Sequence, residues 1–412
     1  MILSKNTHKC RICHKNISII FSDLGYSPLA NAYQKSLKGK ETYYPLKVFF
    51  CNGCKLPQLP EHQSAKKIFK EYDYFSSYSS SWIEHSQRYL KEIIKFAKLK
   101  KDSKICEIAS NDGYLLQFFK EKGFKVLGIE PAKNVADVAI NKGINTEKSF
   151  FGIVSAKRIK KKYGKQDLII ANNVLAHVPD ILDFCGGIKN LMSKNGIATF
   201  EFPHFYNLIN KRQFDTIYHE HFSYLTVHSI KKLFFKFKLE IFDIKKINTH
   251  GGSLRVFVKN KQNKSYKLTS ALSKFLKLEK NSKIFTKKNF SRFNIQIQKI
   301  KKNIIDLLLN LKLNNKKVVA YGAPAKGNTF LNYCMLDNAL IKFTVDKNPS
   351  KFGKFLPGSQ IPILHPKKII SEKPDYIFIL PWNLSKEIIN QIKKIYTGAK
   401  YITAIPKVKI LQ

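Results

Sequence analysis

Two pairs of cysteines near the start of the chain have the spacing of metal ligands. Cys10 and Cys13 form one CxxC pair, and Cys51 and Cys54 form the second. Four thiolates complete a tetrahedral zinc site and leave no coordination position for water. We therefore expect a structural zinc ion that holds a small N-terminal lobe, in preference to disulfide bonds, which are rare in cytoplasmic proteins.

A second group of reactive side chains lies within residues 214–224. Tyr218, His219, Glu220 and His221 follow one another directly. Such groups are costly to bury and useful in a cleft, so we favour acid–base chemistry here. A structural hydrogen-bond network and a metal site are the alternatives, and the metal interpretation lacks further ligands at suitable spacing.

Polar residues also follow two apolar segments that read as strands of a parallel sheet. The strand that begins at residue 104 is followed by the loop Ala109–Gly113, and a second strand over 126–130 ends in Glu130, about twenty residues on. In doubly wound sheets, such a loop binds ligands and such an acid contacts a ribose. Asn172 and Asn173 follow another predicted strand at the same edge. These positions predict a nucleoside site.

A similar unit begins near residue 316. It has a strand over 317–321, a tight loop over 322–329 and a strand that ends at Asp346. The loop has the glycine spacing of a Walker A motif, but Asn328 replaces the lysine that grips phosphate, so we do not expect ATP hydrolysis. A cradle for a phosphate or a sugar, formed by backbone N–H groups and Lys326, remains an alternative.

Length and composition limit the class of protein. The chain has 412 residues, of which 44% are hydrophobic and 25% charged, as in a globular enzyme of two or three domains. The net charge of +44 could indicate nucleic acid or a membrane, but the basic residues are almost all lysines scattered along the whole chain. No apolar run reaches ~20 residues. We expect a cytoplasmic protein with neither partner.

The coarse pattern predicts an α/β fold in three consecutive domains: a zinc-binding lobe over 1–66, a domain over 67–248 and a C-terminal domain over 249–412. An aromatic stretch over 68–82 contains Tyr72 and Tyr78. These aromatic residues either pack in a core or form a lid over the nucleoside loop. Apolar residues at 3-to-4 spacing predict a long amphipathic helix from Phe293 to Leu311.

With these segments in order, the chain closely resembles the sugar C-methyltransferases that act on nucleotide-linked 4-keto deoxysugars. The resemblance covers nearly the whole chain. It rests on the paired CxxC lobe, EIASNDGYLL (107–116), NNVLAHVPD (172–180), FDTIYHEH (214–221), HGGSLRV (250–256), YGAPAKGNTFLNYC (321–334) and LPWN (380–383). One departure is Ala109, where the family usually has glycine.

The resemblance implies a four-cysteine lobe, a central class I methyltransferase domain of Rossmann-like fold and a Rossmann-like C-terminal domain. It implies S-adenosylmethionine as cofactor beside the structural zinc. The cofactor residues would be Glu107, Ala109, Ser110, Asn111, Asp112, Gly113, Glu130, Pro131, Asn172 and Asn173. The substrate residues would be Tyr72, Tyr78, Tyr321, Lys326 and Asn328. The family's base maps onto His221, with Tyr218, Glu220 and His177 as neighbours.

The implied reaction is removal of a proton from the carbon next to the sugar ketone, followed by methylation of the enolate, a step in branched deoxysugar biosynthesis. The implied partner is a nucleotide-linked keto-sugar, bound by a monomer or a homodimer. O- or N-methylation of a sugar nucleotide is the first alternative, because it needs no enolate. A zinc-containing nucleic-acid-binding protein is a more distant one.

Overall fold

The computed structural model describes residues 8–68 and 75–412. Contacts group the chain into two compact units, each drawn from three stretches. The first unit comprises Met1–Ile19, Phe50–His204 and Phe222–Ser282, and the second comprises Ile20–Phe49, Phe205–His221 and Lys283–Gln412. The division into three consecutive sequence domains stays a prediction. The two compact units show that the chain passes repeatedly between its packed parts.

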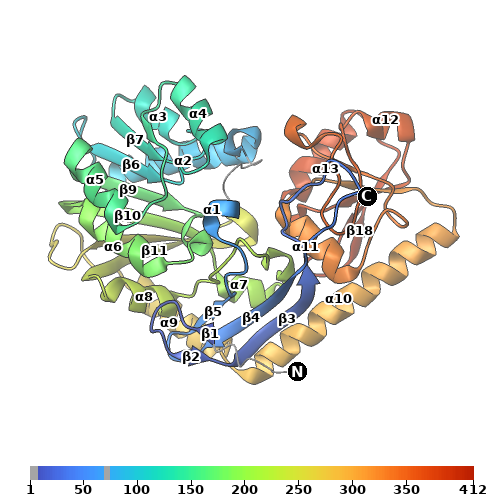
Figure 1. Cartoon of the computed structure of the whole chain (residues 1–412), viewed down its shortest axis with the longest axis horizontal. Helices are drawn as coiled ribbons and strands as arrows, with labels where there is room; N and C mark the ends of the chain where they lie inside the picture. The colour runs from blue at the N-terminus through green and yellow to red at the C-terminus, as the bar shows by residue number, and fades with distance from the viewer. Residues whose placement is uncertain (1–7, 69–74) are drawn as a thin grey trace. The chain divides into compact units, whose positions relative to one another are not determined.

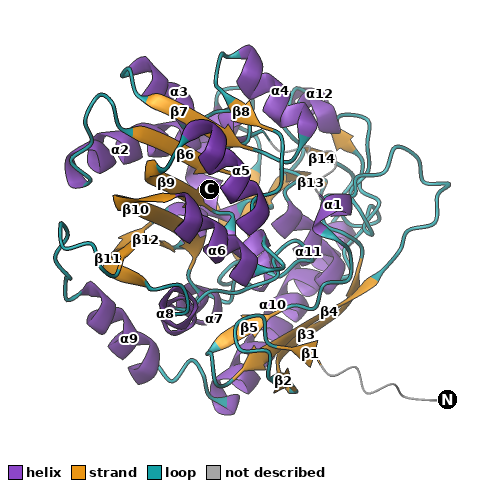
Figure 2. Ribbon diagram, turned by 60° about the vertical axis from the view of Figure 1, so that its left-hand side comes forward, coloured by secondary structure: helices purple, strands orange, loops and turns teal. Residues whose placement is uncertain are grey.

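A seven-stranded sheet forms the centre of the first unit, in the order β11-β12-β10-β9-β6-β7-β8. Figure 2 shows these strands following one another across the sheet. Five are parallel, whereas β12 runs antiparallel to both β10 and β11. The strands are β6 (Lys104–Ile108), β7 (Lys125–Ile129), β8 (Thr146–Glu147), β9 (Gln166–Asn172), β10 (Met192–Pro203), β11 (Leu239–Ile247) and β12 (Ser253–Asn260).

The chain order reverses between β6 and β9, and this reversal locates the binding edge. In open α/β sheets, ligands bind beyond the carboxyl ends of the strands where the winding changes direction. The loops that follow β6 and β9 leave this point. They carry Ala109–Gly113 and Asn173, which the sequence predicts at one edge of the sheet.

Helices cover the sheet because each carries an apolar face. Tyr89 and Ile93 of α2 (Ser80–Phe96) and Phe119 of α3 (Leu116–Glu121) pack in one core with Ile105 and Ile170 of the sheet. The remaining helices of this unit are α1 (Ala65–Ile68), α4 (Lys133–Asn141), α5 (Ile153–Tyr163), α6 (Ile181–Leu191), α8 (Val227–Phe235) and α9 (Ala271–Asn281). Figure 1 shows α2 to α6 around this sheet.

Short elements complete the first unit. The strands β1 (His8–Lys9) and β2 (Asn16–Ile17) pair antiparallel around the first CxxC turn, and β5 (Leu56–Gln58) follows the second. The 3-10 helices among the described residues of this unit are η1 (Ser76–Tyr78), η2 (Leu175–His177) and η4 (Thr249–Gly251).

The second unit contains a six-stranded sheet in the order β15-β14-β13-β16-β17-β18, parallel except for its last strand. Its strands are β13 (Val318–Tyr321), β14 (Thr344–Val345), β15 (Ile363–Leu364), β16 (Tyr376–Ile379), β17 (Lys400–Thr403) and β18 (Lys409–Leu411). Its helices are α7 (Phe205–Asn210), α10 (Lys287–Leu313), α11 (Ala325–Cys334), α12 (Lys368–Glu372) and α13 (Ser385–Lys393). The predicted α/β architecture of this part is therefore confirmed.

The remaining elements of this unit are mainly short. They are η3 (Phe214–Thr216), η5 (Pro349–Lys351), η6 (Trp382–Leu384) and most of β3 (Ile19–Ser27) and β4 (Tyr44–Cys51). The long helix α10 confirms the predicted amphipathic pattern, because its residues Phe293, Ile297 and Leu308 are buried. Within the described parts of the chain, no helix combines the length and apolar character needed to cross a membrane.

Candidate active site and metal centre

The four predicted cysteine ligands come together in the first unit. Their sulfur atoms all lie within 4.8 Å of one another, and the Sγ atoms of Cys13 and Cys51 are 3.8 Å apart. A tetrahedron with zinc–sulfur bonds of ~2.3 Å has sulfur–sulfur edges of about 3.8 Å, so the cluster fits zinc. Among the described residues, no other group of His, Cys, Asp or Glu side chains is placed to hold a metal ion. None of the seven cysteines forms a disulfide bond.

Tight turns aim these sulfur atoms inward. The N–H group of His14 donates to Cys10 O at 2.8 Å, and that of Cys54 donates to Cys51 Sγ at 3.4 Å. Burial raises the pKa of the Cys51 thiol to about 11. A nearby dication would compensate this cost of ionisation, which is the chemistry of a zinc–thiolate site.

The loop between β6 and α3 departs from ordinary backbone geometry at three positions. The angle φ is +56° at Ala109, +51° at Asn111 and +77° at Gly113. Left-handed values cost a residue with a Cβ atom roughly 1–2 kcal/mol, whereas glycine adopts them freely. This explains the glycine that the family usually has at position 109. At Gly113, a Cβ atom would lie 2.3 Å from Ile144 Cδ1, so the loop packs closely there.

Side chains of this loop hold the segment that precedes α2. Asn111 Oδ1 accepts a hydrogen bond from Ser76 N at 2.9 Å. Asp112 Oδ2 accepts from the hydroxyl of Ser77 and from its N–H group, the latter at 3.3 Å. The loop and η1 are therefore fixed to each other.

Three buried atoms of β6 and this loop have no hydrogen-bond partner among the described residues: Oε2 of Glu107, Oγ of Ser110 and Oδ1 of Asp112. Buried polar groups are nearly always paired, so these atoms fit a polar ligand at this edge of the sheet. Burial raises the pKa of Glu107 well above its usual range, and the nearby Asp112 adds to the effect. A cationic ligand would favour the ionised carboxylate.

Glu130 directly follows β7 and lies beside the same loop. Its carboxylate accepts from Asn111 N at 3.0 Å and from Ala132 N at 2.8 Å. Burial raises its pKa to about 7, and these two hydrogen bonds oppose that increase. Each carboxylate oxygen keeps a second lone pair that can accept a ribose hydroxyl. Pro131 follows, half-buried, and leads into α4.

Asn172 and Asn173 lie at the carboxyl end of β9. The N–H group of Asn173 donates to Glu201 O at 2.7 Å, which holds the turn, and its φ is +54°. Among the described residues, Oδ1 of Asn172 and both amide atoms of Asn173 are buried without a partner. These atoms also fit a polar ligand. His177 follows in η2, where it is half-buried.

The described residues of the aromatic stretch 68–82 differ in their surroundings. Trp82 is partly buried and packs against the core of the first unit, whereas Tyr78 is 53% exposed. Trp82 stacks on His85 with ring centroids 4.9 Å apart, and His85 Nε2 bonds to Glu201 Oε2 at 2.8 Å. Core packing is therefore confirmed for part of the stretch, and the lid stays a prediction for Tyr78. Tyr72 lies outside the described residues.

In the second unit, Tyr218 and His221 form a hydrogen-bonded pair. His221 Nδ1 lies 2.7 Å from Thr216 O, and His221 Nε2 lies 2.7 Å from Tyr218 Oη. A carbonyl only accepts, so Nδ1 carries the proton and Nε2 of the neutral ring accepts from the Tyr218 hydroxyl. This tautomer leaves Nε2 as the basic nitrogen. His219 instead donates to Pro45 O at 3.3 Å, away from this pair.

Glu220 is 3% exposed and contacts a residue from a distant part of the sequence. Asn31 Nδ2 donates to its two carboxylate oxygens at 2.8 and 2.9 Å. Burial raises the pKa of Glu220 to about 7, and the bond from Asn31 opposes the increase. Glu220 can therefore change charge near neutral pH.

A polar cluster surrounds the start of α11. Lys326 Nζ donates to Asn383 Oδ1 at 2.8 Å and lies 5.3 Å from the ring centroid of Trp382. Trp382 Nε1 donates to Asp215 Oδ2 at 2.6 Å. Burial lowers the pKa of Lys326, and the charge of Asp215 opposes this. These groups could hold a phosphate or a sugar hydroxyl.

The predicted loop over 322–329 needs one correction. The helix α11 begins at Ala325, directly after Pro324, so Lys326 and Asn328 lie in its first turn. Proline at this place favours an early helix start, because its ring fixes φ and it lacks an N–H group. Asn328 is buried and donates to Ala30 O at 2.6 Å, and Tyr321 is buried at the end of β13.

Several residues that contact the predicted site residues were not predicted from the sequence. Asn31, Tyr33 and Lys351 contact the Glu220 region or the loop after β13, and Asp215 pairs with Trp382. Asn31 lies in the stretch that the sequence assigned to the zinc lobe. Only its contact with Glu220, 189 positions away, reveals it.

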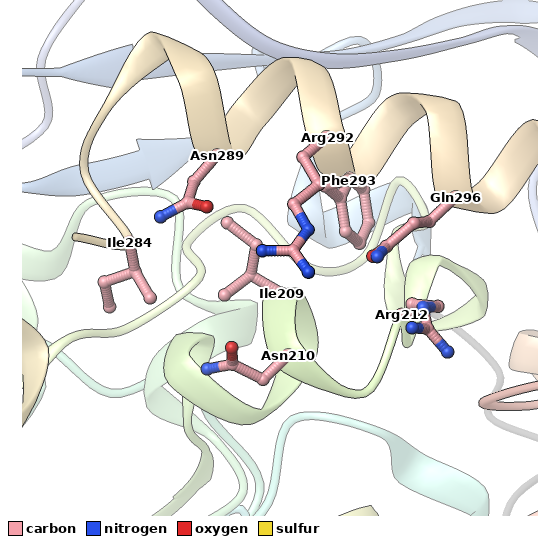
Figure 3. A pocket seen from close by; sticks show the side chains of 8 residues that line it. All are labelled: Ile209, Asn210, Arg212, Ile284, Asn289, Arg292, Phe293 and Gln296. Atoms are coloured by element: carbon pink, nitrogen blue, oxygen red, sulfur yellow. The ribbon is translucent and has the colours of Figure 1, made fainter. Parts of the chain in front are cut away.

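A pocket of about 120 Å³ lies between α7 and the start of α10. Figure 3 shows the side chains that line it. The pocket contains none of the predicted site residues. Its lining consists of Ile209, Asn210, Arg212, Ile284, Asn289, Arg292, Phe293 and Gln296.

Family models match three consecutive stretches of the chain. A model described as a "putative zinc binding domain" matches residues 10–69, a methyltransferase domain matches 82–243, and a C-methyltransferase C-terminal domain matches 248–406. Together with the sheet and the cysteine cluster, these matches define a class I methyltransferase that uses S-adenosylmethionine and carries structural zinc.

A curated relative makes the class more specific. The chain is 31% identical to the C-methyltransferase NovU from Streptomyces niveus over 406 residues, which covers 98% of this chain and 96% of that protein. The chain belongs to this family of C-methyltransferases. The resemblance stated from sequence, the fold class and both cofactors are thus confirmed.

Solved structures match about half of this chain. The PH0226 protein from Pyrococcus horikoshii OT3 is 11% identical, with 48% of this chain and 100% of that one covered and a TM-score of 0.36. The magnesium protoporphyrin IX methyltransferase ChlM from Synechocystis PCC 6803 is 14% identical, with 48% and 99% covered and a TM-score of 0.36.

Proposed function

We propose that the methyl acceptor is the carbon next to the ketone of a nucleotide-linked 4-keto deoxysugar, so that the product is a branched sugar. Membership of a C-methyltransferase family supports a carbon acceptor. Such a carbon becomes nucleophilic only after it loses a proton, so the enzyme needs a base. S-adenosylmethionine, when bound, supplies the electrophilic methyl group.

The Tyr218–His221 pair is the observation that carries this proposal. Because Thr216 O holds the proton of Nδ1, the opposite nitrogen of His221 is a base aimed at the Tyr218 hydroxyl. The proton of the sugar carbon passes to Tyr218 Oη while the hydroxyl proton passes to His221 Nε2. The products of this step are an enolate and an imidazolium. Such a base typically contributes 10²- to 10⁴-fold in rate.

Other residues have supporting roles in the proposal. Glu220 holds or releases a proton near the pair, and His177 donates to the developing enolate oxygen. Tyr321, Lys326 and Asn328, with Tyr72 and Tyr78, contact the sugar nucleotide. The charge of Asp215 counterbalances that of the buried Lys326 when the substrate is away.

The cofactor would be held by the loop and strand ends of the first unit. Glu107, Ser110 and Asp112 present the buried atoms that match its amino-acid group, together with Ala109, Asn111 and Gly113. Glu130 and Pro131 would contact the ribose, and Asn172 and Asn173 the region near the sulfur. The support for these assignments is that the buried polar atoms without a partner match the hydrogen-bonding groups of this cofactor.

The decisive experiment measures proton loss separately from methyl transfer. The protein is incubated in heavy water with a panel of nucleotide-linked 4-keto deoxysugars and no cofactor, and deuterium uptake is followed by mass spectrometry. We expect uptake at one carbon next to the ketone and, with labelled cofactor, a methyl group on the same carbon. Methylation of oxygen or nitrogen without deuterium uptake would reject the proposal in favour of the first alternative.

Two variants test the assigned base. His221→Ala should reduce deuterium uptake at least 100-fold while cofactor affinity stays within a few-fold. Tyr218→Phe should also lose uptake, because it removes the atom through which the proton passes. His365→Ala, which changes an exposed histidine of the same unit, is the matched control. Normal uptake by His221→Ala would exclude His221 as the base.

The remaining expectations follow from the same chemistry. A small sugar nucleotide needs no nucleic-acid surface, and reduced zinc ligands suit a cytoplasmic enzyme. We expect a monomer or a homodimer and no salt-sensitive binding to single- or double-stranded nucleic acid.

A further inference from the structure

Residues 30–33 contact two separate parts of the second unit. Asn31 donates to both carboxylate oxygens of Glu220, and Asn328 Nδ2 donates to Ala30 O at 2.6 Å. The Tyr33 hydroxyl donates to Ala323 O at 2.5 Å and lies 3.2 Å from Asn31 Oδ1. The segment is therefore fixed on both sides of Asn31, which holds the amide in place against the carboxylate.

The surroundings of Glu220 contain few charges. Tyr33 faces it from the same segment as Asn31, and the ion pair between Lys351 Nζ and Asp346 Oδ2, 3.7 Å long, lies beyond Tyr33. On its own segment, Glu220 has His219 and His221 as neighbours. Among the described residues, no cation forms an ion pair with Glu220. Asn31 is therefore the group that directly favours the ionised carboxylate.

We propose that Asn31 is a positioning residue that sets the orientation and the ionisation of Glu220. This inference rests on the proposed function, in which Glu220 works beside the Tyr218–His221 pair. A single amide N–H₂ group that reaches both oxygens fixes the plane of the carboxylate. It also stabilises the negative charge without adding a positive one, so Glu220 can still take up a proton near neutral pH.

The sign of the expected effect follows from this contact. Asn31→Leu removes the donor and keeps a side chain of similar size, so the neutral acid is favoured and the pKa of Glu220 rises. Hydrogen bonds to charged groups correspond to a shift of roughly one to two pH units. If the ionised carboxylate is the active form, the acidic limb of kcat/KM moves to higher pH by the same amount.

A direct measurement keeps the test independent of activity. Carbon-13 spectra of protein labelled at glutamate carboxyl groups give the titration midpoint of Glu220, which is assigned by its loss in Glu220→Gln. We expect the midpoint to rise by about one pH unit or more in Asn31→Leu. Tyr33→Phe, which removes a hydroxyl of the same segment but not the donor, is the matched control and should move it less. An unmoved midpoint in folded Asn31→Leu overturns the inference.

The kinetic arm separates the inference from the proposed function. In Asn31→Leu the pH profile should shift and kcat should fall about tenfold, and Asn31→Ser, which keeps a donor, should recover part of both. In the Glu220→Gln background, Asn31→Leu should have no further effect on the profile. A lower kcat with an unshifted profile overturns the inference. Absence of methyl transfer by the unaltered protein on every keto-sugar, with the midpoint shift intact, counts against the proposed function alone.

Discussion

At the scale of single residues, Ala109 shows how backbone geometry constrains the site. Its φ of +56° is costly for alanine, and the residue stands in the loop that follows β6. Ala109→Gly removes a Cβ atom from a left-handed position but adds chain entropy to the unfolded state. We expect a net increase of about 1 kcal/mol in the free energy of unfolding.

Urea unfolding checks this value, and Ala132→Gly, at a buried position with ordinary φ of −78°, serves as the control that should lose stability. Cofactor affinity should stay within a few-fold. A loss of stability in Ala109→Gly would show that the methyl group packs usefully and that the strain is already relieved.

The same scale shows what sequence could and could not predict. The strand–loop–helix around Glu107–Leu116 and the two CxxC pairs are each short motifs of neighbouring residues. Residue spacing in the sequence is therefore enough to predict them. The pairing of Asn31 with Glu220 joins residues 189 positions apart and depends on how the chain returns to the second unit. Helix α11 began earlier than predicted, because Pro324 acts as a start signal rather than as part of the loop.

At the scale of elements, a buried glutamate fixes α9 to the start of α8 and to the end of β10. Glu279 Oε1 bonds to His204 Nε2 at 2.7 Å and accepts from Val227 N at 2.6 Å, and its Oε2 bonds to His228 Nδ1 at 2.5 Å. Burial raises the pKa of Glu279, but the bonds to both histidines outweigh it, and the net result is a pKa of about 2. The carboxylate is thus ionised in the folded protein.

Glu279→Gln should lower the free energy of unfolding by about 3 kcal/mol, because it leaves buried donors unpaired. Urea unfolding at neutral pH measures the loss. Lys280→Gln, on the exposed side of the same helix, should change stability by less than about 0.5 kcal/mol. Equal stabilities of the two variants would mean that α9 is held mainly by its apolar contacts.

At the scale of the whole molecule, buried carboxyl groups give a characteristic dependence of stability on pH. Glu130 and Glu220 have pKa values raised to about 7 by burial, from ordinary values near 4.5. A raised folded-state pKa favours folding below the ordinary pKa, and this contribution is lost as pH rises through about 7. Glu279 acts in the opposite sense, because its lowered pKa contributes above the ordinary value and is lost in acid.

We therefore expect the free energy of unfolding, without ligands, to be greatest near pH 4.5 and to fall by about 1 kcal/mol per pH unit per raised carboxyl group between roughly pH 4.5 and pH 7. Above pH 7 it should level off, because these carboxyl groups are then ionised in both the folded and the unfolded state. Urea titrations from pH 4 to pH 9 test the profile. Glu220→Gln should make the fall between pH 4.5 and pH 7 less steep. An unchanged slope over this range in that variant would show that Glu220 ionises in the folded state near its ordinary pKa.

The zinc cluster links distant parts of the chain, which gives it a global role. Its two CxxC pairs belong to the first unit, while the chain between them, 20–49, belongs to the second and carries Asn31. Chelation of zinc should therefore disturb residues 20–49 of the second unit as well as the residues around the four cysteines. We expect one zinc ion per chain by elemental analysis, and after chelation rapid proteolysis within residues 8–68.

Because residues 30–33 hold Glu220, zinc loss should also move the Glu220 midpoint upward, in the direction expected for Asn31→Leu. Cys54→Ser should reproduce the effect of chelation, whereas Cys185→Ser, which alters a buried cysteine outside the cluster, should retain zinc. Retention of the normal Glu220 midpoint in zinc-free protein would mean that the segment is held by its contacts with Ala323 and Asn328 alone. The metal would then stabilise only the N-terminal lobe.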